Sequence, residues 1–147
     1  MADIRHRVGI RATEDEVRRS LTTLDGLAGW WTTTVEGDPG PGGTLRFFFG
    51  QPDPAALMEV VAVDDAAVRW RCVEGPDDWV GTTVTFATTP SDGETVLVFT
   101  HGDWRQPTEF MHHCSTKWGY FLVGLKTALE GGPSLAFPND MAISGWG

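Results

Sequence analysis

The chain has 147 residues, of which 41% are hydrophobic, and this size and composition are those of one domain that buries its own core. Twenty Asp and Glu residues against eleven Lys and Arg residues give a formal net charge of −9, which repels nucleic-acid phosphates and anionic membrane surfaces. We therefore expect no nucleic-acid partner.

The ends and the cysteines indicate where the protein works. The first ten residues, MADIRHRVGI, are too polar for a signal peptide, and no apolar run reaches the roughly 20 residues of a membrane span. Cys72 and Cys114 fall at apolar positions of an expected strand and an expected helix, where buried free thiols are usual, although a disulfide between them stays open. We expect a soluble cytoplasmic protein without a membrane span.

The N-terminal third predicts a strand, two short helices and a second strand. Apolar and basic residues alternate over residues 4–11, which is typical of an edge strand with one apolar face. Thr13 precedes three acidic residues, the pattern of a helix N-cap and an acidic first turn. Gly26 and Gly29 divide the helical segment into two pieces, and the next strand is expected over residues 31–36.

Five more strands follow through short connections. The turn signals are the Gly- and Pro-rich stretch 38–43 and the stretch Pro90 to Gly93. Because short connections join only antiparallel neighbours, the sheet is predicted to be antiparallel. The five strands are expected at residues 44–49, 57–63, 67–73, 81–88 and 94–101.

One long amphipathic helix is predicted from Pro107 to Glu130. Pro107 suits the first turn, and Gly131-Gly132-Pro133 ends the pattern. At about 1.5 Å per residue the helix spans roughly 35 Å, enough to cover the apolar face of the sheet. Its apolar stripe consists of Met111, Cys114, Trp118, Phe121, Leu122, Leu125 and Leu129.

The predicted fold class is therefore α+β: a seven-stranded antiparallel sheet wrapped around a long C-terminal helix, with two short helices after the first strand. We expect one domain over residues 1–132 and a C-terminal tail over residues 133–147. The tail contains four large apolar residues, which is unusual for a disordered peptide, so we expect it to pack on the body or on a second subunit. These residues are Phe137, Met141, Ile143 and Trp146.

Three segments carry a resemblance to a known family: the Trp30-Trp31 pair, FTHGDW at 99–104, and KWGYFLVGLKTALEGG at 117–132. Together they resemble the START-like or Bet v 1-like (SRPBCC) superfamily, and within it the branch homologous to the C-terminal domain of the activator of Hsp90 ATPase. The resemblance covers residues 3–132. It implies a helix-grip fold around a hydrophobic cavity, in a superfamily that binds lipids, sterols, polyketides or other apolar molecules and includes some cyclases.

The candidate site is the space between the sheet and the long helix. Aromatic walls with few polar groups suit an apolar ligand, and a filled core is the alternative for the same residues. No cofactor is expected, and no metal, since the neighbouring side chains of His112, His113 and Cys114 point about 100° apart on a helix. The expected ligand-binding residues are Trp30, Phe47, Phe49, Met58, Trp70, Phe86, Phe99, His101, Trp104, Met111, Trp118 and Phe121.

Three functions remain open on the sequence alone. The first is binding of a hydrophobic or aromatic small molecule in this cavity. The second is a cyclase or hydrolase in which His101 acts as general base and Arg46 or Arg105 polarises a carbonyl; the alternative for His101 is a hydrogen bond to a neighbouring residue. The third is an interaction module that forms a homodimer or associates with a chaperone.

Overall fold

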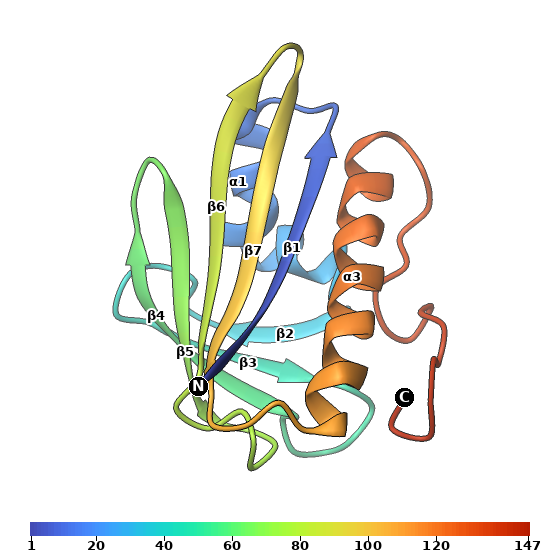
Figure 1. Cartoon of the computed structure of the whole chain (residues 1–147). Coiled ribbons are helices and arrows are strands. Elements are labelled where there is room, and N and C mark those ends of the chain that lie inside the picture. The colour runs from blue at the N-terminus through green and yellow to red at the C-terminus, as the bar shows by residue number, and fades with distance from the viewer.

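The computed structural model describes all 147 residues and contains seven strands and three helices (Figure 1). In chain order these elements are β1 (Ala2–Ile10), α1 (Glu14–Thr22), α2 (Leu24–Ala28), β2 (Thr34–Gly37), β3 (Thr44–Phe48), β4 (Ala56–Val63), β5 (Ala67–Glu74), β6 (Thr83–Ser91), β7 (Glu94–Trp104) and α3 (Glu109–Leu129).

All seven strands belong to one antiparallel sheet in the order β1-β7-β6-β5-β4-β3-β2. Consecutive strands from β2 to β7 are neighbours, as their short connections require. The β6–β7 hairpin turns at Asp92 and Gly93, whose φ angles of 42° and 83° are those of a type I′ turn. The fold class predicted from the sequence is confirmed.

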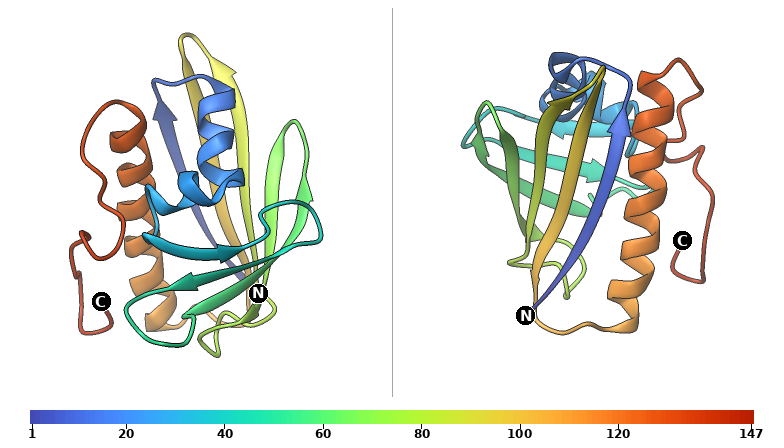
Figure 2. Two further views of the ribbon diagram at one scale, coloured as in Figure 1. Left: turned by 180° about the vertical axis from the view of Figure 1, so that it is seen from behind. Right: turned by 45° about the horizontal axis from the view of Figure 1, so that its top comes forward.

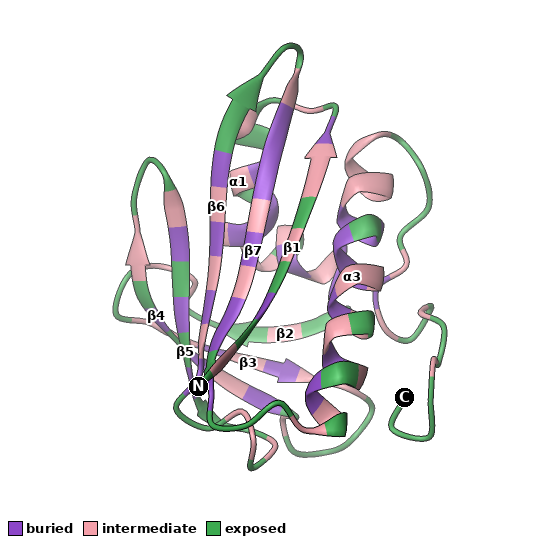
Figure 3. Ribbon diagram, viewed as in Figure 1, coloured by how far each residue is buried: buried purple, intermediate pink, exposed green.

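The sheet curves so that its two ends enclose α3. Strands β1, β6 and β7 run along the helix, whereas β2 and β3 cross toward it (Figure 1). The buried residues of α3 lie on the side that faces the sheet (Figure 3). His6 on β1 fixes this contact through a 2.9 Å hydrogen bond between its Nε2 and the carbonyl oxygen of Ser115. The two short helices, α1 and α2, contact β6 and β2.

Some element boundaries differ from the prediction. β2 begins at Thr34 and not at Trp31, because the Trp31 amide donates to the Leu27 carbonyl of α2 and its carbonyl accepts from the Phe137 amide of the tail. β6 continues through Pro90, which was expected in a turn, and it can do so because the neighbouring strand β5 ends its pairing at Ala87. β7 continues past His101 to Trp104.

The helix ends are set by side-chain caps. Thr13 and Glu16 form a capping box at the start of α1, as the sequence pattern indicated. At the start of α3 the N-cap is Thr108, whose Oγ1 accepts a 3.3 Å hydrogen bond from the amide of Met111. Pro107 therefore lies before the helix and not in its first turn.

The tail, residues 133–147, runs back along the outer side of α3 (Figure 2). It is attached to the segment before β2 by two main-chain hydrogen bonds of 3.0 Å each, from the Phe137 amide to the Trp31 carbonyl and from the Thr33 amide to the Phe137 carbonyl. Ala136, beside this attachment, is fully buried. The tail thus packs on the body of the same chain and adds a layer outside the helix.

Candidate functional site

A cavity of about 540 Å³ lies between α3, the tail and the loops that follow β3 and β5. This volume is in the range of small-molecule binding pockets, about 300–1,000 Å³. Twelve of its 18 lining residues are hydrophobic. The lining consists of Trp31, Phe49, Ala55, Ala56, Pro76, Trp79, Phe110, His113, Cys114, Lys117, Trp118, Phe121, Phe137, Pro138, Asp140, Ala142, Trp146 and Gly147.

Three tryptophans form the inner wall of the cavity. The ring planes of Trp79 and Trp118 are 16° apart with centroids at 6.0 Å, and those of Trp31 and Trp79 are 26° apart at 6.4 Å. Trp31 and Trp118 also touch directly, at 4.8 Å. Near-parallel indole faces are a surface on which a flat aromatic ligand stacks well.

The outer wall comes from the tail and is partly polar. Phe137 packs on Phe49 with ring centroids 5.3 Å apart. Farther along, Asp140 forms a 2.7 Å salt bridge with Lys117 of α3. His113, one turn earlier on the helix, lies within hydrogen-bond distance of the Ser144 hydroxyl, with Nδ1 to Oγ at 2.7 Å. Burial lowers the pKa of His113, and the nearby Lys117 lowers it further.

Three of the twelve predicted ligand-binding residues line this cavity: Phe49, Trp118 and Phe121. The other nine are buried in the core between the sheet and α3, where they pack against one another. Trp70, for example, stacks with Trp31 and meets Phe86 edge to face at 4.9 Å. The nine core residues are Trp30, Phe47, Met58, Trp70, Phe86, Phe99, His101, Trp104 and Met111.

His101 lies inside the core, fully shielded from solvent. The Trp118 indole Nε1–H donates to His101 Nδ1 at 3.1 Å, and because an indole can only donate, Nδ1 carries no proton. His101 Nε2–H therefore donates to Thr82 Oγ1 at 2.8 Å, and Thr82 donates to the Trp79 carbonyl at 2.5 Å. Burial lowers the pKa of His101 to about 3. The lone pair that a general base would use is occupied, so this histidine is a neutral packing residue.

The two candidate arginines are also engaged elsewhere. Arg46 pairs with Glu36 on the adjacent strand at 3.5 Å. Arg105 donates to the carbonyls of Val80 and Asp77 in the loop before β6, at 3.1 and 2.5 Å. Neither guanidinium lines the cavity or contacts His101. The chain therefore offers no assembled set of base and electrophile around this histidine.

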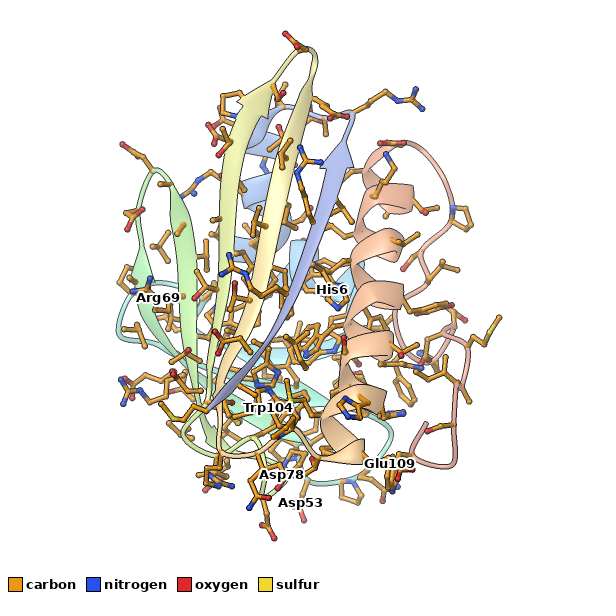
Figure 4. All side chains as sticks on the ribbon, viewed as in Figure 1. His6, Asp53, Arg69, Asp78, Trp104 and Glu109 are labelled. Atoms are coloured by element: carbon orange, nitrogen blue, oxygen red, sulfur yellow. The ribbon has the colours of Figure 1, made fainter.

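The HGDW segment, residues 101–104, holds the end of the sheet together. Asp103 has a φ of 70°, and it accepts a hydrogen bond from Thr83 while its amide donates to Asp3. Trp104 is fully buried inside the molecule near the start of α3 (Figure 4), and its ring centroid lies 6.3 Å from that of Phe110. The contacts of this segment are therefore structural, whereas His101 and Trp104 were expected to bind ligand.

Neither cysteines nor metal ligands add chemistry to the site. Cys72 and Cys114 are free thiols, and burial raises their pKa values to about 11 and about 12. No group of three or more His, Cys, Asp or Glu residues is placed to hold a metal ion. None of the three helices is long and apolar enough to cross a membrane.

Several lining residues were not predicted from the sequence, above all Trp79, Phe110 and Lys117. Trp79 follows a turn-like stretch and belongs to no periodic pattern, so the large apolar side chain was the only sign in the sequence that it packs against other residues. Lys117 lies off the apolar stripe of α3 and looked like a solvent-facing residue. The aromatic residues of the tail did give a signal, since their presence in a terminal segment indicated packing.

An antiparallel sheet that grips one long C-terminal helix, with an apolar cavity beside that helix, defines the START-like (SRPBCC) fold, whose members bind hydrophobic ligands or act as polyketide cyclases. Residues 11–130 match the family described as "Activator of Hsp90 ATPase homolog 1-like protein". The chain belongs to this family. No curated protein sequence matches the chain.

Solved structures support the same assignment. The Aha1 dimer from Colwellia psychrerythraea is 38% identical, with a TM-score of 0.81 over 90% of this chain and 98% of that one. Protein SSP2350 from Staphylococcus saprophyticus is 19% identical, with a TM-score of 0.75 over 90% and 95% of the two chains. CalU16 from Micromonospora echinospora is 17% identical, with a TM-score of 0.75 over 97% and 75%. The last two show the fold alone.

Proposed function

We propose that this protein binds an apolar, aromatic small molecule in the cavity between α3, the tail and the loops after β3 and β5. The observation that carries the proposal is the aromatic lining of a space of about 540 Å³. Eight aromatic side chains surround this ligand-sized space. Three of them, Trp31, Trp118 and Phe121, also belong to the buried core, and the other five exceed what closing the core requires. The eight are Trp31, Phe49, Trp79, Phe110, Trp118, Phe121, Phe137 and Trp146.

The location supports binding better than catalysis. Substrate turnover needs a base or nucleophile at the cavity surface, and His101 is sealed in the core with both ring nitrogens hydrogen-bonded. Two other reactive side chains line the cavity. Burial raises the pKa of the Cys114 thiol and keeps it protonated, and His113 is hydrogen-bonded to Ser144 of the tail. The cavity therefore has the walls of a binding site without an activated catalytic group.

The test is titration with a neutral fluorophore, N-phenylnaphthylamine, whose emission rises in apolar surroundings. Trp79→Ala removes one stacking face of the cavity. We expect the dissociation constant to rise about tenfold, the effect of losing one aromatic contact. The control is Val80→Ala, at the adjacent exposed position outside the cavity. Equal affinity for both variants and for the wild type would refute this binding site.

We also infer that the chain forms a homodimer. The supporting observation is its 38% identity, over 90% of its length, to the Colwellia protein described as a dimer. The β2 edge of the sheet has no neighbouring strand, and two large apolar side chains of the tail, Met141 and Trp146, are exposed, so both are available to a second copy. Light scattering at micromolar concentration is expected to give twice the 16.1 kDa chain mass. The chain mass alone would refute the dimer.

A further inference from the structure

One cation lies in the wall of the cavity, and the tail neutralises it. All three hydrogens of the Lys117 ammonium have acceptors: the Asp140 carboxylate at 2.7 Å, the Met141 carbonyl at 2.5 Å and a main-chain oxygen of Gly147 at 2.9 Å. The side chains of Lys117 and Asp140 are only 14% and 13% exposed. Asp140 supplies the anionic side chain of this set.

The surroundings of Lys117 make that charge necessary. Its Nζ lies 5.4 Å from the ring centroid of Tyr120 and 5.3 Å from that of Phe121. A partly buried ammonium among aromatic rings is costly unless an anion compensates for lost hydration. His113, the other basic group in the lining, is held toward its neutral form because burial and Lys117 lower its pKa. Lys117 is therefore the point of positive charge in this cavity.

Asp140 is a replaceable partner. Its carboxylate makes no polar contact other than the salt bridge to Lys117. Asp140 lies in the part of the tail after Phe137, which has no regular secondary structure. The residue that follows Asp140, Met141, is 62% exposed. A carboxylate on such a segment can leave the cavity without breaking any helix or strand hydrogen bond.

We propose that the ligand of this cavity is an aromatic acid whose anionic group takes the place of Asp140 on Lys117. This inference rests on the proposed function and specifies its ligand class. The aromatic body stacks on the indoles of Trp31, Trp79 and Trp118, and the acid group forms with Lys117 the charge-assisted hydrogen bond that Asp140 forms in this structure. Asp140 is then an internal competitor that stabilises the lysine until the ligand arrives.

The test uses two probes that share one ring system. N-phenylnaphthylamine is neutral, and anilinonaphthalenesulfonate carries the same rings plus one sulfonate. Asp140→Asn removes the competing charge, and we expect it to raise the affinity for the anionic probe about tenfold relative to the affinity for the neutral probe. Lys117→Met is expected to lower the same ratio of affinities about tenfold.

Matched controls separate this local effect from a change in net charge. Asp92→Asn removes one negative charge, as Asp140→Asn does, but in the β6–β7 turn (Figure 1), whose residues do not line the cavity. Lys126→Met removes one positive charge, as Lys117→Met does, at a position on α3 where the lysine pairs with Glu130 and not with the tail. Both controls are expected to bind the two probes as the wild type does.

The outcomes distinguish the two proposals. Neutral-probe binding to the wild type, with equal changes in the ratio of the two affinities for Asp140→Asn and Asp92→Asn, would overturn the aromatic-acid inference and leave the binding site intact. Absence of neutral-probe binding to the wild type would overturn the proposed function, and this inference with it. A selective gain for the anionic probe in Asp140→Asn, lost again in Asp140→Asn combined with Lys117→Met, is the result that we expect.

Discussion

Burial of His101 as a neutral side chain makes the fold acid-sensitive, and the size of this effect follows from its pKa values. The ordinary pKa of 6.5 falls to about 3 in the folded protein because of burial. Above pH 6.5 the side chain is neutral in both states and contributes nothing. Between pH 6.5 and about 3 only the unfolded chain binds the proton, so the free energy of unfolding decreases as the pH falls. One group gives about 1.4 kcal/mol per pH unit, or about 3 kcal/mol by pH 4.5.

The variant that isolates the effect of His101 protonation on stability is His101→Gln. A glutamine amide can accept from the Trp118 indole and donate to Thr82 Oγ1, but it does not titrate. Urea unfolding followed by tryptophan fluorescence, at pH values from 7 to 4.5, gives the free energy of unfolding of both proteins. We expect the wild type to lose about 3 kcal/mol more than the variant across this range. A difference between the two proteins that is constant with pH would refute the assignment of His101 as buried and neutral.

Two further predictions concern α3. Leu122 is fully buried and Val123 is 51% exposed. In urea unfolding we expect Leu122→Ala to lower the free energy of unfolding by about 2–5 kcal/mol and Val123→Ala by less than about 0.5 kcal/mol. Similar losses for the two variants would contradict the orientation of the helix. Thr108→Ala removes the N-cap and should cost about 1 kcal/mol, whereas Thr108→Ser keeps the hydroxyl and should restore most of it; an equal loss for both would show that the cap is not formed.

The architecture was predictable because it depends on local patterns. Alternation over residues 4–11 and the three- and four-residue spacing from Met111 to Leu129 each fix which face of an element is apolar. Short turns then require antiparallel pairing. Trp31 was misplaced at the start of a strand because a large aromatic residue is equally typical of a strand and of a core segment between elements.

The site was predicted only in part, for a reason of geometry. Periodicity identifies residues that face the interior, but it does not distinguish a packed interior from an open one. Phe49, Trp118 and Phe121 line the cavity, while Trp70 and His101 face the same interior and are closed over by neighbouring rings. The space itself arises where the tail crosses over α3, and contacts between residues that lie far apart in the sequence, from Trp31 to Gly147, leave no local pattern in it.

We expect a ligand to bind in the cavity beside α3 and not in the packed core. The seven tryptophan indole N–H groups report on both places. In a ¹H–¹⁵N NMR spectrum recorded during addition of N-phenylnaphthylamine, we expect the indole signals of the four lining tryptophans to shift and those of the three core tryptophans to stay. The lining tryptophans are Trp31, Trp79, Trp118 and Trp146, and the core ones are Trp30, Trp70 and Trp104. Shifts confined to the core tryptophans, or no shifts at all, would contradict the account.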